Sequence, residues 1–258
     1  MTTYVQKQRL FVETDLADGA TIAVSGPQAH YLLNVMRMKA GDTVTVFNGR
    51  DGEWAGEIVL VKKKECHLKL IRQARVQTEN PDIWLAFAPI KKARIDLIAE
   101  KSAELGTRLI WPVITQRTNA ERVNLVRLRA NAVEAAEQCG LLAIPEVHAV
   151  TTLGELIDTW PRDRRLFWLD ETGGGRPIAD VVPAYKGVPC GFLIGPEGGF
   201  AKSELDALRE LPFVTALGLG PRILRAETAV VAALACWQAI CGDWRSPIGA
   251  DPSLDKTP

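Results

Sequence analysis

The hydrophobic and polar positions follow two different rhythms along the chain. Up to about residue 76 the apolar positions form short runs or alternate with polar ones, which is typical of β-strands. After the first clear strand, Asn48-Gly49 favours a hairpin turn, because both central residues of such a turn need a positive φ. Several short strands without long helices predict a small barrel of about 70 residues. The strands expected here are residues 43–47, 54–61 and 66–70.

From residue 83 onward, short apolar strands alternate with helices whose apolar residues recur at helical spacing. Thr152 and Glu155 have the spacing of a capping box, and Ser203 can cap a helix that runs to Glu210. This alternation predicts an α/β fold with a mostly parallel sheet that helices cover on both faces. The strands expected are residues 83–88, 109–114, 166–169, 192–194 and 215–219, and the longer helices are 91–105, 121–138 and 227–240.

The change of rhythm predicts two domains. Thr78-Glu79-Asn80-Pro81 is the expected linker between them. We therefore predict an N-terminal domain at residues 1–76 and a C-terminal domain at residues 77–245. Residues 246–258 are rich in proline, aspartate and serine, and we expect a loose tail there.

The composition is that of a soluble globular protein, with 47 % hydrophobic and 24 % charged residues among 258. Five cysteines without a Cys-x-x-Cys pair argue against a disulfide framework or a structural zinc site, and three scattered histidines add no metal-ligand spacing. The first residues lack the apolar core of a signal peptide, and the uncharged stretch 228–242 is shorter than the ~20 apolar residues of a membrane helix. We expect a cytoplasmic protein without a metal ion or a membrane span.

The formal net charge is zero, from 31 basic and 31 acidic side chains, which argues against a simple polycationic nucleic-acid binder. The balance is uneven, however. Residues 1–76 carry an excess of +3, residues 77–150 are neutral, and residues 151–258 carry an excess of −3.

Two glycine-rich loops are the strongest candidates for a binding site. Residues 194–199 (Ile-Gly-Pro-Glu-Gly-Gly) and 217–225 (Leu-Gly-Leu-Gly-Pro-Arg-Ile-Leu-Arg) each follow a predicted strand. Ligands of open α/β sheets bind at the carboxyl ends of the strands, and glycine lets a ligand approach the main chain closely. Ordinary βα turns also favour glycine and proline, but two such loops with embedded charges favour two walls of one pocket. The sequence lacks a complete Rossmann fingerprint, a P-loop and a nucleophile elbow.

Charged residues near these loops have two interpretations each. Arg225 and Glu227 either form an ion pair at a helix start, or the arginine faces an anionic or developing-anion substrate. Lys91, Lys92 and Arg94 open another helix, where positive charge opposes the helix dipole. A nearby anion such as RNA phosphate explains that placement, and a solvated charge run explains it as well.

The paired motifs identify a family resemblance. Residues 193–199 and 219–229 (Leu-Gly-Pro-Arg-Ile-Leu-Arg-Ala-Glu-Thr-Ala) resemble those of the bacterial 16S ribosomal RNA uridine-N3 methyltransferase family, in the SPOUT superfamily. The resemblance covers roughly residues 8–243, with supporting matches at 9–12, 35–38, 100–106 and 134–140. The family usually has an arginine where Leu141 stands and a basic residue where Asn34 stands. Both departures concern the RNA contact surface and leave the two loops intact.

The resemblance implies an N-terminal PUA-like RNA-binding β-barrel and a C-terminal α/β-knot domain with a trefoil knot. It implies a homodimer that methylates N3 of a uridine in the 16S rRNA of the small ribosomal subunit, with S-adenosyl-L-methionine as cofactor. The implied cofactor-binding residues are Leu193, Ile194, Gly195, Pro196, Glu197, Gly198, Gly199, Leu219, Gly220, Ile223, Leu224 and Thr228. The RNA-binding residues expected are Arg9, Arg37, Lys91, Lys92, Arg94 and Arg117.

The expected catalytic residues are Arg225, Glu227 and Glu197. Arg225 stabilises the negative charge that spreads onto the uracil oxygens, and Glu197 or Glu227 accepts the N3 proton. Ordering Arg225 is an equally good role for Glu227. Two other functions compete: a SPOUT methyltransferase acting on another RNA or base, and a non-catalytic ribosome-binding factor on a decayed fold. The intact glycines and charges of both loops argue against decay.

Overall fold

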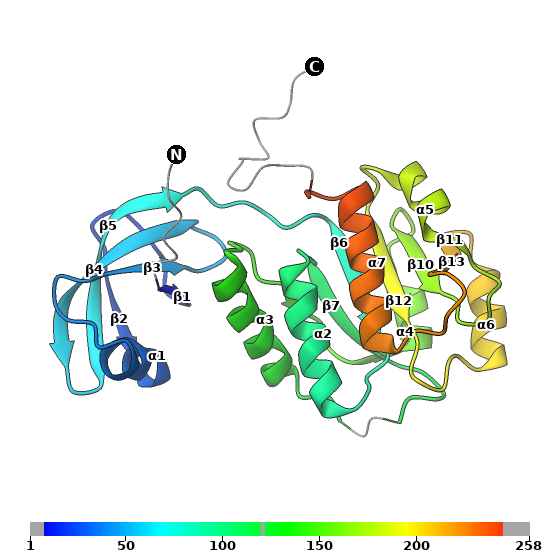
Figure 1. Cartoon of the computed structure of the whole chain (residues 1–258), viewed down its shortest axis with the longest axis horizontal. Helices are drawn as coiled ribbons and strands as arrows, with labels where there is room; N and C mark the ends of the chain where they lie inside the picture. Colours follow the sequence, from blue (N-terminus) through cyan, green and yellow to red (C-terminus); the bar gives the residue numbers. More distant parts are fainter. Residues whose placement is uncertain (1–7, 120–121, 245–258) are drawn as a thin grey trace, which may run out of the picture. The chain divides into compact units, whose positions relative to one another are not determined.

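The computed structural model describes residues 8–119 and 122–244, and the chain divides into two compact units (Figure 1). Among the described residues, the first unit comprises those up to Glu79 together with Ala136–Ala143, and the second comprises those between Asn80 and Ala135 and those from Ile144 onward. The inclusion of Ala136–Ala143 in the first unit is a feature that the sequence did not indicate. The predicted tail, and Glu121 as the expected helix start, lie outside the described residues.

The first unit is built on a five-stranded sheet with the strand order β1-β3-β4-β5-β2. β1 and β3 are parallel, and the other neighbours are antiparallel. Its core is formed by inward-facing apolar side chains such as Val44, Val46 and Ile58. The elements are β1 (Arg9–Phe11), β2 (Thr21–Ser25), α1 (Gly26–His30), the π-helical η1 (Tyr31–Val35), β3 (Thr43–Phe47), β4 (Glu53–Lys62) and β5 (Glu65–Arg75).

The connection between β3 and β4 differs from the predicted two-residue turn. Phe47 pairs with Glu53, so residues 48–52 form a longer loop. Gly49 has a positive φ of 82°, but Asn48 does not belong to the residues with positive φ. Instead its side-chain Oδ1 accepts hydrogen bonds from the amides of Arg50 and Asp51, at 3.0 and 2.8 Å. Asn48 thus shapes the loop through its side chain, as asparagine commonly does in turns.

The second unit contains a parallel sheet with the strand order β11-β13-β10-β12-β6-β7-β8, and β9 pairs with β7 off this path. Every strand pair in it is parallel. The strands are β6 (Ile83–Phe87), β7 (Leu109–Ile114), β8 (Glu146–Val147), β9 (Thr151–Thr152), β10 (Arg165–Leu169), β11 (Arg176–Pro177), β12 (Cys190–Ile194) and β13 (Val214–Gly218).

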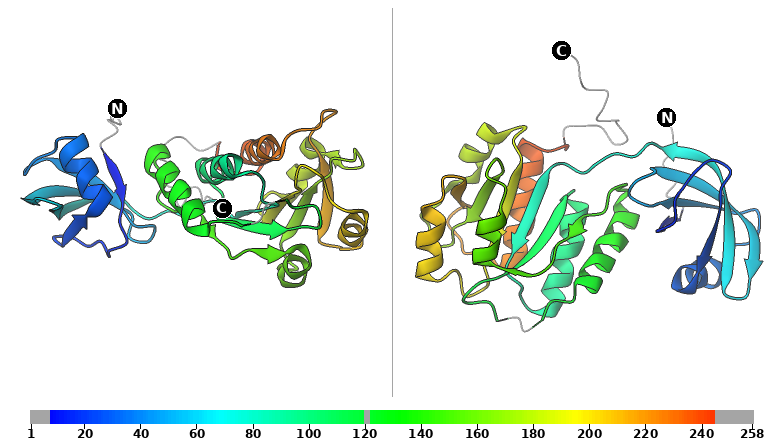
Figure 2. Two further views of the ribbon diagram at one scale, coloured as in Figure 1. Left: turned by 90° about the horizontal axis from the view of Figure 1, so that it is seen from below. Right: turned by 180° about the vertical axis from the view of Figure 1, so that it is seen from behind.

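Helices pack on both faces of this sheet (Figure 2). One core gathers Leu85 and Phe87 with apolar residues of α2, α3, α5 and α7, and the other gathers Trp111 and Trp168 with those of α4 and α6. The predicted mostly parallel sheet with two covered faces is confirmed. The helices are α2 (Lys92–Glu104), α3 (Leu125–Cys139), α4 (Leu153–Thr159), α5 (Ile178–Val181), η2 (Val182–Tyr185), α6 (Lys202–Arg209) and α7 (Ala226–Ile240).

Two predicted helix starts had different outcomes. At α4 the capping box is present: Thr152 Oγ1 accepts from the Glu155 amide at 3.2 Å, and Glu155 Oε2 accepts from the Thr152 amide at 2.7 Å. At α6 the prediction was wrong, because Ser203 lies inside the helix and Ala201 precedes it. Glu204 caps this helix instead, since its carboxylate accepts from the Ala201 amide at 2.8 Å.

No helix in the described ranges is long and apolar enough to cross a membrane. Those ranges also contain no group of three or more His, Cys, Asp or Glu side chains that could hold a metal ion. The trefoil knot that the resemblance implies stays a prediction.

Candidate functional site

A cavity of about 530 Å³ opens at the carboxyl ends of β10, β12 and β13. We call it the strand-end cavity. The parallel pairing of β10 with both β12 and β13 brings the loops after these three strands side by side. The two glycine-rich loops predicted from the sequence therefore lie on either side of the loop that follows β10, and all three line the cavity.

Most of the predicted cofactor-binding residues line this cavity: Ile194, Gly195, Pro196, Glu197, Leu219, Gly220, Ile223 and Leu224. The other four do not. Leu193 is fully buried in the core beneath α4 and α6, and Thr228 is exposed on α7. Gly198 and Gly199 continue the loop beyond the wall, where the Gly198 carbonyl accepts from Arg117 Nη1 at 2.9 Å. Gly199 has a φ of +66° and packs against Glu171.

The loop after β10 supplies a third wall that the sequence analysis missed. Asp170 is buried and its Oδ1 accepts from the Thr172 amide and hydroxyl, at 2.9 and 2.6 Å. A Cβ on Gly175 would overlap the main chain of Leu217 in β13. The signal was present in the sequence, because Gly173-Gly174-Gly175 follows a predicted strand just as the other two loops do.

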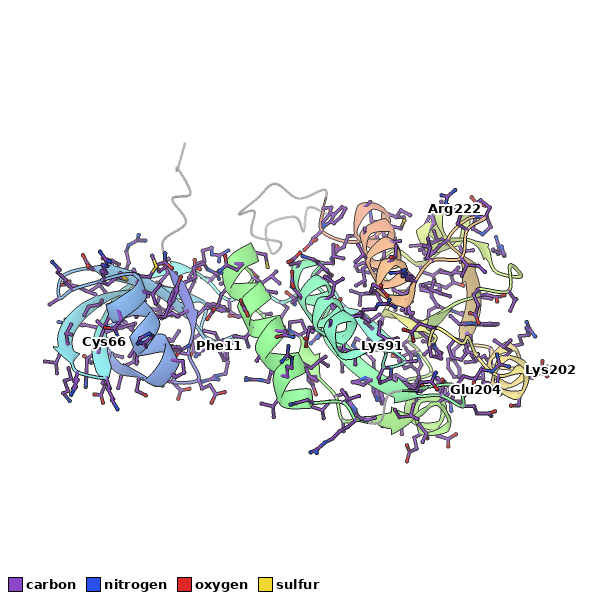
Figure 3. The ribbon with its side chains drawn as sticks, turned by 60° about the horizontal axis from the view of Figure 1, so that its bottom comes forward. Phe11, Cys66, Lys91, Lys202, Glu204 and Arg222 are labelled. Carbon is purple, nitrogen blue, oxygen red and sulfur yellow. The ribbon has the colours of Figure 1, made fainter. Side chains whose placement is uncertain are left out.

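The strand-end cavity combines apolar walls with an excess of carboxylates. Leucine and isoleucine side chains from all three strand ends face it, together with main-chain atoms of the glycines. Its charged lining residues are Asp170, Glu171, Glu197 and Arg222, and Figure 3 labels Arg222 on the loop after β13. Three carboxylates against one guanidinium favour a ligand with positive charge.

Beside the cavity, Arg94 joins two carboxylates from different elements. Its Nη1 lies 3.3 Å from Glu197 Oε1, and its Nε lies 3.4 Å from Glu227 Oε1. Arg94 belongs to the first turn of α2, Glu227 to the first turn of α7, and Glu197 to the loop after β12. The second oxygen of Glu227, Oε2, is buried and has no hydrogen-bond partner in the described part of the chain.

Arg225 is exposed and immediately precedes α7. It does not line the strand-end cavity, and within residues 8–119 and 122–244 its guanidinium has neither a hydrogen bond nor an ion pair, although its carbonyl accepts from the Ala229 amide at 2.8 Å. Glu227 contacts Arg94 rather than Arg225. The structure thus brings Glu197 and Glu227 together but does not bring Arg225 to them.

Arg9, which the sequence analysis assigned to RNA, is enclosed within the first unit. Its side chain is 7 % exposed, and its Nε donates to Glu53 Oε1 at 2.6 Å. The two remaining nitrogens donate to the carbonyls of Ala136, Glu137 and Leu141 at 2.7–2.9 Å. A guanidinium with all its nitrogens bonded inside the protein has little left to offer a phosphate. The structure therefore contradicts an RNA contact for Arg9.

The other predicted RNA-binding residues differ in placement. Arg37 is exposed in the first unit and has an unusual positive φ of 56°. Lys91 is exposed just before α2 (Figure 3). Arg117 is exposed and holds the Gly198 carbonyl. The Lys92 side chain lies outside the described part.

Comparison with known proteins gives matches over nearly the whole chain. The model of an RNA methyltransferase domain matches residues 78–238, and the model of an RNA methyltransferase PUA domain matches residues 24–71. A protein of Rickettsia conorii named ribosomal RNA small subunit methyltransferase E is 29 % identical, over 88 % of this chain and 93 % of that protein. Its Bacillus subtilis namesake is 28 % identical, over 88 % of this chain and 94 % of its own length.

A solved structure is similar as well. The crystal structure of a ribosomal RNA small subunit methyltransferase E from Neisseria gonorrhoeae, bound to S-adenosyl methionine, has a TM-score of 0.84 with this chain. The two are 27 % identical, and the match covers 92 % of this chain and 99 % of that one. The first unit is accordingly a PUA-like domain, and the second is an α/β domain of the methyltransferase type.

Proposed function

Because the chain belongs to the RNA methyltransferase family, we propose that it methylates N3 of a uridine in the 16S rRNA of the small ribosomal subunit, using S-adenosyl-L-methionine. The observation that carries the proposal is the strand-end cavity, built by the three loops in a chain that matches the family over most of its length. Because its proposed substrate is the RNA of the small ribosomal subunit, we expect the protein to act in the cytoplasm.

The strand-end cavity suits the proposed cofactor. Its volume of about 530 Å³ lies within the roughly 300–1,000 Å³ common for small-molecule sites. The apolar side chains of Leu169, Ile194 and Leu217 can pack against the faces of an adenine ring. The carboxylates of Glu171 and Glu197 offer opposite charge to a sulfonium and an ammonium group. Gly175 lines the cavity and packs closely against the main chain of Leu217, so a side chain at this position would displace the cavity wall.

Glu227 is the best placed general base. The bound cofactor supplies an electrophilic methyl group on a sulfonium sulfur. Glu227 Oε1 is held by Arg94, while Oε2 is buried without a partner and is therefore a ready acceptor for a proton. As N3 forms its bond to the methyl carbon and the carbon–sulfur bond breaks, Glu227 Oε2 takes the N3 proton. Burial keeps competing water away from this oxygen.

Arg225 is proposed to contact the substrate directly. It stands exposed at the start of α7, two residues before Glu227. As the uridine loses its proton, negative charge spreads onto the uracil oxygens, and a guanidinium can donate two hydrogen bonds to such acceptors. The exposed Arg37, Lys91 and Arg117, together with Lys92, are proposed to hold RNA phosphates.

We propose that the protein is a homodimer that buries the outer side of α7. This side presents Thr228, Val231, Ala232, Ala235 and Ala239, which lie on one face of the helix and are all at least partly exposed. Partly exposed apolar residues in a continuous stripe favour a protein interface. Light scattering is expected to give twice the mass of 28.3 kDa, and Ala235→Arg is expected to give the monomer. A wild-type monomer contradicts this part of the proposal.

Incubation with radiolabelled S-adenosylmethionine and unmethylated small subunits tests the proposed activity. Incorporation into 16S rRNA as 3-methyluridine is expected, and Glu227→Gln is expected to lower the rate by about 10²–10⁴-fold, the usual contribution of a general base. Incorporation into another RNA or at another atom favours a related methyltransferase. Calorimetry that detects no uptake of the cofactor favours a ribosome-binding factor without catalysis.

A further inference from the structure

The first turn of α2 carries positive charge where the helix dipole favours negative charge. Lys91 immediately precedes the helix, Lys92 and Arg94 lie in its first turn, and this first turn contains no acidic residue. Such an arrangement persists most readily when an anion lies close by. For Arg94 the structure supplies the anions from within the chain.

The guanidinium of Arg94 contacts Glu197 and Glu227 through two different nitrogens, Nη1 and Nε. Glu197 is in the wall of the strand-end cavity, and Glu227 follows Ala226, which is in the wall too. The Arg94 side chain is 32 % exposed and that of Glu227 is 12 % exposed, so this ion pair is partly shielded from water. Two carboxylates that both approach one point repel each other unless a cation lies between them.

We propose that Arg94 is a positioning residue for methyl transfer rather than an RNA contact. It anchors Glu227 through Oε1, which leaves the buried and unpartnered Oε2 as the proton acceptor of the proposed function, and it ties the cavity wall at Glu197 to the same point. The inference rests on the proposed function. It adds that Arg94 links the loop of Glu197, in the cavity wall, to the proton acceptor Glu227. Lysine is a poor substitute, because a single ammonium lacks the planar fork that reaches two carboxylates from separate nitrogens.

The test separates turnover from binding in the full-length protein with unmethylated small subunits. Arg94→Ala is expected to lower kcat about 100-fold, since a misplacement of about 1 Å in a reacting group has this effect, while the KM for the subunits changes little. Arg94→Lys is expected to recover part of kcat. Added guanidinium ion is expected to restore part of kcat in Arg94→Ala but none in Glu227→Gln.

The double variant Arg94→Ala with Glu227→Gln measures the coupling. If Arg94 acts through Glu227, the double variant loses no more activity than Glu227→Gln alone. The matched control is Lys202→Ala, which removes a basic residue from the first turn of another helix, α6 (Figure 3). It is expected to leave kcat and KM unchanged. Thermal unfolding of every variant verifies that it is folded, and Arg94→Gln replaces Arg94→Ala if that variant is not.

Four outcomes overturn the inference. A raised KM with an unchanged kcat in Arg94→Ala restores the RNA contact as the role of Arg94. Full additivity in the double variant shows that Arg94 acts independently of Glu227. A wild-type protein that transfers no methyl group overturns both the inference and the proposed function, whereas an active wild type with an unaffected Arg94→Ala overturns the inference alone.

Discussion

Glu53 shows what a single buried charge does in the first unit. Its side chain is 7 % exposed, and Arg9 and Arg75 bind its two oxygens at 2.6–2.9 Å. Burial by itself raises the pKa of the Glu53 carboxyl, but hydrogen bonds and charge from Arg75 and Arg9 outweigh it, so the pKa lies below its ordinary value of 4.5. The folded state therefore favours the ionised form.

Replacement of Glu53 by Gln is expected to lower the free energy of unfolding by about 3 kcal/mol at pH 7, because it strips a buried cation of its carboxylate. A folded-state pKa below the unfolded value stabilises the protein at neutral pH; this contribution begins to decline below about pH 4.5 and is lost as the pH falls through the lower folded-state pKa. Urea unfolding at several pH values is expected to show the two proteins converging in acid. Glu57→Gln, on the same strand, is the control. A difference that is constant with pH contradicts this account.

The glycines of the strand-end cavity are required for two different reasons. A Cβ on Gly175 would collide with the main chain of Leu217, whereas a Cβ on Gly220 meets no atom but is strained by a φ of +95°. Gly220→Ala is thus expected to cost about 1–2 kcal/mol of stability with a folded protein. Gly175→Ala has to displace β13 and is expected to weaken S-adenosylmethionine binding more strongly. Calorimetry and thermal unfolding of both variants measure this, and equal cofactor affinities contradict it.

At the scale of helices and strands, local signals succeeded where the decisive interaction is itself local. The alternation in β3 and the capping box at Thr152 depend on residues a few positions apart, and both elements lie where they were expected. Short edge strands such as β1 and β2 escaped detection, because three to five residues held by distant partners leave too little pattern. The start of α6 depends on Glu204, whose carboxylate also accepts from the Gln116 amide of a remote loop.

The capping box of α4 gives a prediction at this scale. Thr152→Ala removes the acceptor for the Glu155 amide and is expected to reduce stability by about 1 kcal/mol. Thr152→Ser keeps the hydroxyl and is expected to stay close to the wild type. The comparison uses chemical denaturation of the intact chain. If serine costs as much as alanine, the hydroxyl hydrogen bond is not the source of the stability.

At the scale of the molecule, the sequence predicted two walls of the candidate site but not which carboxylates pair with its arginines. Each glycine-rich loop follows its own strand, so its place at the carboxyl end of a parallel sheet could be predicted. The partners of Arg9 and Arg94 could not, because they are separated from them by 44 to 133 residues in the sequence. An arginine in a sequence shows that a charge exists, and only the fold shows which anion it faces.

The difference between paired and exposed cations reduces the set of residues that we expect to contact RNA. Arg9 and Arg94 are bound to carboxylates of the chain, whereas Arg37 in the first unit and Lys91 in the second are exposed. The zero net charge therefore does not exclude RNA binding, because the relevant quantity is the number of exposed cations that meet phosphates. Each phosphate contact adds roughly 0.7–0.9 to the slope of log affinity against log salt concentration.

Arg37→Gln and Lys91→Gln are each expected to reduce that slope by roughly 0.7–0.9, and the double variant by the sum, if both units contact the RNA. Titration of unmethylated small subunits at several salt concentrations provides the measurement. Lys202→Gln, exposed on α6 away from the strand-end cavity lining, is expected to keep the wild-type slope. A slope that falls only with Arg37→Gln confines the phosphate contacts to the PUA-like unit. A slope unchanged in all variants shows that neither Arg37 nor Lys91 contacts an RNA phosphate.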